Sequence, residues 1–477
     1  MNIINSLKWS AFTEVLSKIL PPIFYIINAR ILTPDDFGIV ATSAMIIALS
    51  NILWEAGLAK KLIQMDGVNG FKSACNIVFY SNVMISIIVF LILYLCSDYL
   101  AEFFQREEIS DVIKVTGFSI IFGAFSSVQT ALFQKFFKYK KLFIARLSGG
   151  ILPGLVSVTF AYLGYGYWAL VFGSVASVFI QAVVLWYVSE WRPTLSYDLS
   201  LAKEMFSFSK WVMLSALLSW FFAWGDIFVI SYYFNLHEVG LYRTGNYFVA
   251  TVIGLIATPV VPVMYSYFSS MRLSSEGLSR SLLLASKAIS FFVLPISVAI
   301  FLFQIPLSSL LFGEKWVGIG NIIGILALMH GVSWIIGLNN EAYTAVGRPD
   351  LETKILTINI IVYAIVYWLV AKISFDMFLL ARFALAVFSI FVHVVVSKKV
   401  LNIGIRENFY NISSILFSLI MVFIFNYLFF PIINTVLLMA LSAAFSLVIY
   451  LFCVFLFDRF FFNELIKVVK NRGSKVD

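Results

Sequence analysis

Apolar stretches of about twenty residues recur from one end of this 477-residue chain to the other, separated by short polar breaks. A bilayer core about 30 Å thick is crossed by roughly 20 apolar residues of helix. Only 12% of the residues are charged, whereas a soluble domain carries about a quarter. The pattern predicts an all-α polytopic membrane protein and leaves no room for a soluble domain.

About fourteen spans are predicted from these stretches. An even number of spans places both termini on the same side of the membrane. The predicted spans cover residues 9–31, 38–59, 73–97, 112–134, 143–165, 167–188, 207–232, 240–268, 282–304, 317–338, 353–371, 375–397, 411–430 and 432–457.

The orientation follows from lysine and arginine, which are retained in short cytoplasmic loops. With the N-terminus inside, the inner segments hold most of these residues, and the segment 97–111, "SDYLAEFFQREEISD", becomes an outer loop with five acidic residues against Arg106 alone. We therefore expect both termini to be cytoplasmic. The net charge of +8 is spread over the inner segments, which argues against a nucleic-acid partner and favours anionic membrane lipids for the basic tail.

The stretch "RILTPDDFGIV", residues 30–40, interrupts the apolar pattern between the first two spans. Pro34 resists continuation of a helix, and Asp35 and Asp36 are natural turn and N-cap residues. Gly38 relaxes the backbone that follows. The stretch predicts a hairpin tip, and the orientation above places it outside.

The chain also resembles itself at an offset of 202 residues. Lys8 and Trp9 then align with Lys210 and Trp211, and Asp36 and Gly38 align with Glu238 and Gly240. Because six spans separate the copies, both cross the membrane in the same direction, as in a parallel repeat. We expect an N-terminal lobe (1–190), a cytoplasmic linker (191–206), a C-terminal lobe (207–400), two appended spans (408–457) and a basic tail (458–477).

Two such lobes enclose a central cavity, and ionisable residues inside the spans should mark it, since each is costly in hydrocarbon. On the first span, Glu14, Lys18, Tyr25 and Asn28 share one helix face. Glu14 and Lys18 are four residues apart, so mutual neutralisation remains an alternative to a transport role. Asp226 on the seventh span has no partner within a helical turn. Glu14 and Asp226 are the candidate ion-coupling residues, and both H⁺ and Na⁺ remain open.

Four arginines lie within or beside the predicted spans. Arg30 and Arg243 lie near the outer ends, and Arg146 lies about a turn from the cytosolic edge, where snorkelling explains it equally well. Arg382, flanked by "LLA" and "FALAV", is the hardest to interpret as a surface residue. His330 and His393 are isolated, and we expect them to be packing residues.

Several motifs appear in a recognisable order. These are "ARILTPDDFGIVA" (29–41), "GLAKKLIQ" (57–64), "LGYGYWALVFG" (163–173), "EWRPTLSYD" (190–198), "WGDIFVISYYFNLHEVGLY" (224–242) and "NNEAYTAVGRPD" (339–350). With them, the chain resembles the polysaccharide transporters of the multidrug/oligosaccharidyl-lipid/polysaccharide exporter superfamily, which include Wzx-type flippases and colanic-acid-type exporters. Beyond about residue 400 the resemblance is one of hydropathy alone.

The resemblance implies a MATE-like fold in the bacterial inner membrane. It also implies a flippase that moves an undecaprenyl-diphosphate-linked oligosaccharide, an O-antigen or exopolysaccharide repeat unit, to the periplasmic leaflet by alternating access. A polysaccharide polymerase and chain-length machinery are implied partners, and no metal or other cofactor is implied. Arginine binds diphosphate through bidentate bonds, so the candidate substrate-binding residues are Arg30, Arg146, Arg243, Arg382, Lys18, Tyr25 and Asn28.

Three other functions fit the sequence less well. A MATE-like multidrug antiporter would share the helical core, but cationic drugs favour an acidic cavity, and here intramembrane arginines are at least as numerous as acids. A membrane polysaccharide polymerase would need an extended outer loop with catalytic groups, which the short segment 97–111 does not offer. A membrane scaffold would not need polar stripes on two spans. We therefore expect a transporter and not an enzyme.

Overall fold

The computed structural model describes residues 20–55, 57–65, 70–271, 275–429 and 436–462. Residues 20–31 form the first described helix. The helices that follow are α2 (Pro34–Glu55), α3 (Leu58–Gln64), α4 (Phe71–Phe103), α5 (Glu108–Thr116), α6 (Phe118–Lys135), α7 (Tyr139–Tyr162), α8 (Tyr167–Val188), α9 (Leu199–Tyr233) and α10 (Leu236–Ala257). The remaining elements are α11 (Val260–Ser270), α12 (Ser275–Leu302), α13 (Gln304–Phe312), η1 (Glu314–Trp316), α14 (Ile319–Ser333), α15 (Asn339–Ala345), α16 (Asp350–Val370), α17 (Phe375–Leu401), α18 (Ile405–Phe429) and α19 (Val436–Phe457).

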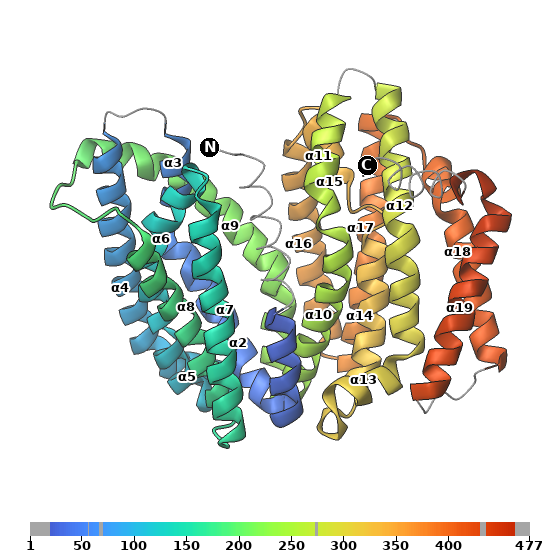
Figure 1. The fold of residues 1–477 in the computed structure, drawn as a ribbon, viewed down its shortest axis with the longest axis horizontal. Coiled ribbons are helices and arrows are strands. Elements are labelled where there is room, and N and C mark those ends of the chain that lie inside the picture. Colours follow the sequence, from blue (N-terminus) through green and yellow to red (C-terminus); the bar gives the residue numbers. More distant parts are fainter. Residues whose placement is uncertain (1–19, 56, 66–69, 272–274, 430–435, 463–477) are drawn as a thin grey trace, which may run out of the picture. The chain divides into compact units, whose positions relative to one another are not determined.

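The helices confirm an all-α multi-pass membrane protein (Figure 1). Eleven described helices are long and apolar enough to cross a bilayer, or twelve if α10 and α11 form one span. Every predicted span from 38–59 onward contains a described helix, although α14 is shorter than the predicted span 317–338. The total of fourteen stays a prediction, because part of the first predicted span lies outside the described residues.

Prolines explain the broken span. A bend of 43° separates α10 from α11, where Pro259 is the N-cap residue of α11. Proline lacks a backbone N–H and clashes with the preceding turn, so it can break or kink a helix. Pro153 and Pro295, by contrast, lie inside the continuous helices α7 and α12.

The chain divides into two compact units. The first holds residues 1–244 and 367–372, and the second holds residues 245–366 and 373–477, so α10 and α16 contribute to both. The predicted lobes were defined by sequence repetition and not by contacts, and their boundary at residues 191–206 stays a prediction.

In the first unit, α7 packs along α8, and α6 packs against both α4 and α8. A buried apolar cluster includes Leu58, Leu62, Ile77 and Val128, and α9 adds Ala202 and Met205 to it. Glycine allows the close approach of α7 and α8, since an added methyl group at Gly173 would meet the Ser157 side chain. The start of α9 is therefore part of the first unit's core.

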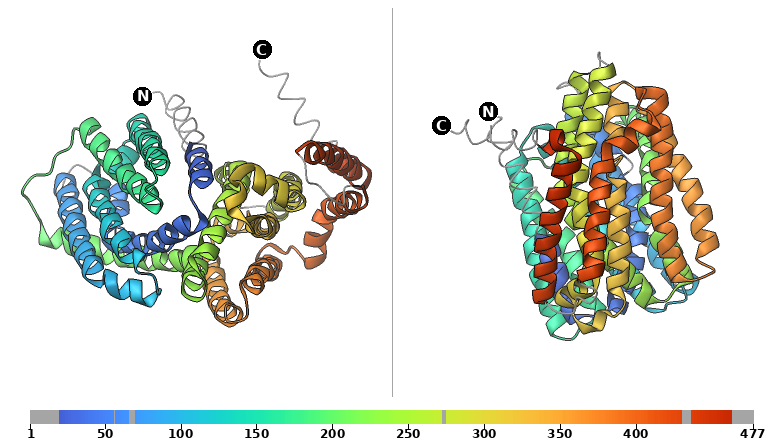
Figure 2. Two further views of the ribbon diagram at one scale, coloured as in Figure 1. Left: turned by 90° about the horizontal axis from the view of Figure 1, so that it is seen from below. Right: turned by 90° about the vertical axis from the view of Figure 1, so that its right-hand side faces the viewer.

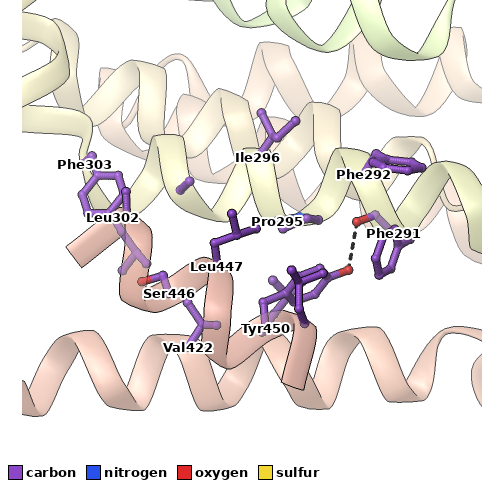
Figure 3. A pocket seen from close by; sticks show the side chains of 14 residues that line it. Phe291, Phe292, Pro295, Ile296, Leu302, Phe303, Val422, Ser446, Leu447 and Tyr450 are labelled. Atoms are coloured by element: carbon purple, nitrogen blue, oxygen red, sulfur yellow. Dashed lines mark hydrogen bonds between the residues drawn. The ribbon is translucent and has the colours of Figure 1, made fainter. Parts of the chain in front are cut away.

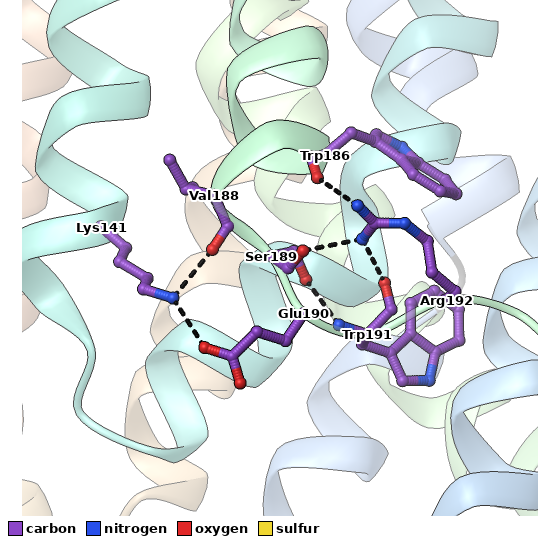
Figure 4. A network of polar contacts seen from close by, with 7 residues as sticks. All are labelled: Lys141, Trp186, Val188, Ser189, Glu190, Trp191 and Arg192. Carbon is purple, nitrogen blue, oxygen red and sulfur yellow. Dashed lines mark hydrogen bonds and ion pairs between the residues drawn. The ribbon is translucent and has the colours of Figure 1, made fainter.

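The segment between α8 and α9 is held by charged side chains (Figure 4). Arg192 donates hydrogen bonds to the carbonyl groups of Trp186, Ser189 and Trp191, which satisfies acceptors left unpaired at the end of α8. Lys141 of α7 donates to the Val188 carbonyl and pairs with Glu190 at 3.2 Å. The hydrogen bond and charge of Lys141 lower the pKa of the Glu190 carboxyl.

The same segment is also attached to α4 through a buried amide. Asn76, 1% exposed, donates to the hydroxyls of Thr194 and Ser196 at 2.7 and 2.6 Å and accepts from the Thr194 amide at 3.0 Å. Asp198 then caps α9 by accepting from the amides of Ser200 and Leu201. An N-cap acceptor of this kind fixes where a helix begins.

In the second unit, α12 and α17 pack against α14, and α18 packs against α12. The helices α18 and α19 run side by side (Figures 1 and 2). Asn426 of α18 joins them by donating to Ser446 at 2.7 Å and accepting from Ser442. Lys287 of α12 pairs with Asp458, just beyond α19, and thereby ties α12 to the end of that helix.

Candidate functional site

Both predicted hairpin tips are closed by reciprocal side-chain bonds. The Thr33 amide donates to the Asp36 carboxylate at 2.9 Å, and the Asp36 amide donates back to the Thr33 hydroxyl at 3.4 Å. The aligned residues repeat this arrangement: the Asn235 amide donates to Glu238 at 3.2 Å, and the Glu238 amide donates to Asn235 at 2.8 Å. These are capping boxes at the starts of α2 and α10. The offset of 202 residues thus relates two tips of the same local geometry.

Below the tips lies Asp226, a carboxylate on α9 that is 3% exposed. Tyr242 of α10 donates a hydrogen bond of 2.7 Å to one carboxylate oxygen, and the Ile227 amide donates one of 2.7 Å to the other. A buried carboxylate without such donors would be costly in hydrocarbon. Asp226 therefore has a hydrogen-bond partner on the next helix, where spacing within one helix does not reveal it.

The first described helix contributes two of the predicted residues. Tyr25 shares a hydrogen bond of 3.0 Å with Thr244 of α10. Asn28 is 3% exposed; its amide donates to the Phe24 carbonyl at 2.9 Å, while its side-chain oxygen has no hydrogen-bond partner within the described residues. Both lie within about two turns of the hairpin tip.

We call the residues Tyr25, Asn28, Asp226, Tyr242 and Thr244 the polar layer. Tyr25 and Asn28 lie about four to seven positions along the first helix from a hairpin tip. Asp226, Tyr242 and Thr244 lie about seven to nine positions from a tip along α9 or α10. At 1.5 Å per residue, these separations correspond to depths of roughly 6–13 Å. Within α10, Tyr242 faces α9 and Thr244 faces the first helix, as their partners show. The layer therefore surrounds the beginning of α10.

The predicted arginines occupy different environments. Arg243 lies over the ring of Trp224 at 4.5 Å, a cation–π contact beside the polar layer. Arg30 is exposed at the end of the first helix, and Arg146 is exposed on α7. Arg146 makes no hydrogen bond, ion pair or ring contact with any residue that the structure describes. The structure thus brings Arg243, but not Arg146, to Tyr25 and Asp226.

Arg382 lies in the second unit, half-buried on α17. It is within charge-interaction range of His330 on α14 and Tyr363 on α16. His330 shares a hydrogen bond of 2.9 Å with Asn246, so it has a polar partner that its isolation in the sequence did not indicate. The second unit therefore has a polar centre of its own.

The remaining residues named in the sequence analysis are His393, Glu14 and Lys18. His393 stacks on the Tyr343 ring with 6.0 Å between centroids, as a packing residue would. Glu14 and Lys18 lie outside the described residues. Within the described ranges, no group of three or more His, Cys, Asp or Glu side chains could hold a metal ion.

The second unit also contains an apolar pocket of about 380 Å³ (Figure 3). Its walls come from α12, α18 and α19, and its polar groups are few: the Ser446 hydroxyl and that of Tyr450, which donates to the Phe291 carbonyl at 2.9 Å. The labelled side chains include Phe292, Pro295, Ile296, Leu302, Phe303, Val422 and Leu447. An apolar chain could occupy such a space without leaving a polar group unpaired.

Residues missed by the sequence prediction are mainly partners of the predicted ones. Tyr242, Thr244 and Asn246 all lie near the beginning of α10. The pattern of polar residues along one face of a single helix does not reveal them, because each contacts a residue on a different helix. The "GLY" that ends the motif 224–242 was the one available signal for Tyr242.

Residues 27–321 match the model of a family described as "Polysaccharide biosynthesis protein". The chain is 23% identical to the succinoglycan biosynthesis transport protein ExoT of Rhizobium meliloti (strain 1021), over 69% of this chain and 66% of that protein. It is also 23% identical to the teichuronic acid biosynthesis protein TuaB of Bacillus subtilis (strain 168), over 80% and 82%. The lipopolysaccharide biosynthesis protein WzxC of Escherichia coli (strain K12) is 21% identical, over 74% and 71%.

Solved structures share the fold. The lipid II flippase MurJ, in an inward closed conformation, has a TM-score of 0.76 at 13% identity, covering 94% of this chain and 98% of that one. An inward-facing MATE multidrug resistance transporter has a TM-score of 0.63 at 14% identity, covering 81% and 95%. At these identities the likeness concerns the arrangement of helices alone.

Proposed function

Because the chain belongs to the polysaccharide biosynthesis protein family, we propose that it is a flippase for a lipid-linked oligosaccharide. Its substrate would be an undecaprenyl-diphosphate-linked repeat unit of an O-antigen or exopolysaccharide. The observation that carries the proposal is a buried polar layer inside a multi-pass bundle, and all of its residues except Tyr25 lie within residues 27–321, which match the family. The work of such a protein is transport and not catalysis.

The physical problem that a flippase solves is desolvation. Sugar hydroxyls and a diphosphate lose their water in hydrocarbon and need replacement partners. The polar layer offers hydroxyl, amide and carboxylate groups, and Arg243 beside it and Arg382 in the second unit offer guanidinium groups. Guanidinium binds phosphate oxygens through paired, charge-assisted hydrogen bonds. Arg30 and Arg146 fit a role at the edge of the path better than one inside it, since both are exposed.

The lipid part of the substrate needs a different environment. A prenyl chain is apolar, and the pocket between α12, α18 and α19 is apolar over nearly all of its wall. We assign the prenyl chain to this pocket. A prenyl chain held there exchanges lipid for an equally apolar wall, so van der Waals packing decides its position, and it does not share the polar path taken by the sugars.

The direction of transport follows from the proposed orientation. Both termini are assigned to the cytoplasm of a bacterium and the hairpin tips to the periplasmic side of its inner membrane, as the distribution of lysine and arginine predicts. The repeat unit then moves outward by alternating access. Polysaccharide polymerase and chain-length machinery would take it up on the far side.

Asp226 is the proposed ion-coupling residue. A carboxylate in this position can exchange a proton or bind Na⁺ when ionised, and the Tyr242 hydroxyl can hold it in either case. Glu14 keeps the same proposed role and Lys18 keeps its proposed role with the substrate, although both lie outside the described residues. The coupling ion is H⁺ or Na⁺.

The proposal is tested by deleting the gene in its own bacterium and restoring it on a plasmid. We expect the deletion strain to lose surface polysaccharide and to accumulate the lipid-linked repeat unit, and restoration to reverse both. Unchanged surface polysaccharide, together with greater sensitivity to cationic drugs, would favour a multidrug antiporter instead.

A further inference from the structure

The end of α8 and the segment that follows it are rich in large aromatic side chains. Four tryptophan or tyrosine residues lie within twelve positions of the sequence, namely Trp186, Tyr187, Trp191 and Tyr197. Tryptophan and tyrosine concentrate where a bilayer meets water, because their rings are apolar and their N–H or O–H groups are polar. This part of the first unit therefore has the composition of a membrane–water interface.

Apolar side chains of the same region point away from the protein. Tyr187 is 88% exposed, Leu195 is 98% exposed and Leu199 is 72% exposed. The backbone around Leu195 is held to α4, because Asn76 bonds with Thr194 and Ser196 and because the hydroxyls of Ser81 and Tyr197 share a hydrogen bond of 2.9 Å. Apolar groups fixed in such positions are unfavourable in water and favourable in lipid.

The first turns of α9 extend this surface. In Figure 1 the beginning of α9 lies at the same end of the first unit as α3, which it contacts. Ala202 and Met205 face the core. About a quarter-turn away, at 3.6 residues per turn, lies an exposed stripe with spacings of four, three and four residues. The stripe consists of Leu199, Lys203, Phe206 and Lys210.

The charge of this surface is positive. Each of the three acidic residues between positions 186 and 210 has a partner within the protein: Glu190 (with Lys141), Asp198 (the cap of α9) and Glu204 (with Lys61). Lys203 makes no hydrogen bond or ion pair with any residue that the structure describes, and Lys210 lies over the ring of its neighbour Trp211 at 5.7 Å. Both ammonium groups are therefore available to an anion outside the protein.

We propose that Leu195, Leu199, Lys203, Phe206 and Lys210, the interfacial surface, bind anionic phospholipids. The apolar side chains enter the edge of the acyl layer, and the two lysines reach the headgroup phosphates. In the proposed orientation these lipids belong to the cytoplasmic leaflet. The role assigned to the interfacial surface does not depend on the proposed function, because it concerns how the first unit is held in its membrane and not what the protein carries.

Contact with lipid is tested by quenching of fluorescence. Leu195→Cys carries a fluorophore in full-length protein whose natural cysteines at 75, 96 and 453 are replaced by alanine. The protein is reconstituted into vesicles of phosphatidylcholine and phosphatidylglycerol in equal amounts, with bromine atoms on the acyl chains of one lipid or the other. Val448→Cys, 64% exposed in the middle of α19, is the control for a side chain that faces lipid without a lysine beside it.

We expect brominated phosphatidylglycerol to quench the label at Leu195 about twofold more than brominated phosphatidylcholine does, because the lysines enrich the anionic lipid around it. Lys203→Gln combined with Lys210→Gln should make the two lipids quench equally. Lys398→Gln with Lys399→Gln removes the same charge from the last turn of α17 and should leave the preference unchanged. At Val448 the two lipids should quench equally in every variant.

Two results would overturn the proposal. Absence of quenching at Leu195 by either lipid would show that the interfacial surface faces water or another protein. Equal quenching by both lipids with Lys203 and Lys210 present would show contact with the bilayer but no recognition of anionic lipid. Leu199→Cys gives a second labelling position with the same expected outcome, so the test does not depend on a single variant.

Discussion

Tyr242 donates a hydrogen bond of 2.7 Å to Asp226 from sixteen residues away, across the turn that joins α9 to α10. The carboxylate is 3% exposed, so this hydroxyl is a principal means of keeping a charge inside the bundle. We predict that Asp226→Asn lowers transport by about tenfold or more, because the amide oxygen can still accept from Tyr242 but the amide can neither exchange a proton nor bind Na⁺ as a carboxylate does. The amount of protein in the membrane should not change.

The measurement is surface polysaccharide per unit of membrane-inserted protein. Asp376→Asn is the matched control, because Asp376 is an exposed acid in the first turn of α17. It should transport as the wild type does. Normal transport by Asp226→Asn would remove Asp226 from the mechanism.

The pair formed by Lys287 and Asp458 makes a separate prediction about stability. Their side chains are 10% and 19% exposed, and the Ser414 hydroxyl also donates to Asp458 at 3.3 Å. Removing one partner leaves a buried charge unpaired, so Lys287→Met or Asp458→Leu alone should destabilise the protein by about 3–5 kcal/mol. The double variant should recover most of this loss. Unfolding in detergent micelles checks it, and equal losses in single and double variants would contradict it.

Asn76 should control how firmly the segment between α8 and α9 is held. Asn76→Ala removes three hydrogen bonds to Thr194 and Ser196, at an expected cost of about 1–3 kcal/mol. We predict faster proteolysis within residues 189–198. Ser196→Ala removes only one of the bonds and should have a smaller effect. Identical cleavage rates in the wild type and Asn76→Ala would show that other contacts hold the segment.

Asp198 gives a pH dependence to the start of α9. Its hydrogen bonds from Ser200 and Leu201 lower the pKa of its carboxyl below the ordinary value of 3.8. A lowered pKa in the folded state means that the cap stabilises fully above the ordinary pKa and loses its effect as pH falls through the lower one. Protection of the Ser200 and Leu201 amides from hydrogen exchange should therefore fall below about pH 4. In Asp198→Asn, whose side chain does not titrate, this fall should be absent.

The hairpin tips illustrate what the sequence could predict. The turn and the helix cap at the first tip were predicted from Pro34, Asp36 and Gly38. The alignment at an offset of 202 residues then predicted the same local structure at Glu238 and Gly240. The structure has a capping box at both tips. The start of a helix and its cap depend on residues that are neighbours in the sequence, so they can be predicted from the sequence alone.

The surroundings of the charged residues were harder to predict. Asp226 looked unpaired because helical spacing reports neighbours three and four positions away, whereas Tyr242 lies on another helix. Position along the spans distinguished Arg382 from the other three arginines, but it did not predict that Arg146 is exposed while Arg243 lies over Trp224. Which face of a helix meets which neighbour depends on packing that one sequence does not display.

Movement of the substrate itself between leaflets is the most direct test of the proposed flippase. Purified protein is reconstituted into vesicles with the polyprenyl-diphosphate-linked oligosaccharide extracted from the deletion strain, and the exposed sugars are labelled by a reagent that cannot cross the membrane. We expect the wild type to make nearly all of the lipid-linked oligosaccharide accessible, while empty vesicles and Asp226→Asn leave about half of it protected. Equal protection in vesicles with and without the wild-type protein would contradict the assignment as a flippase.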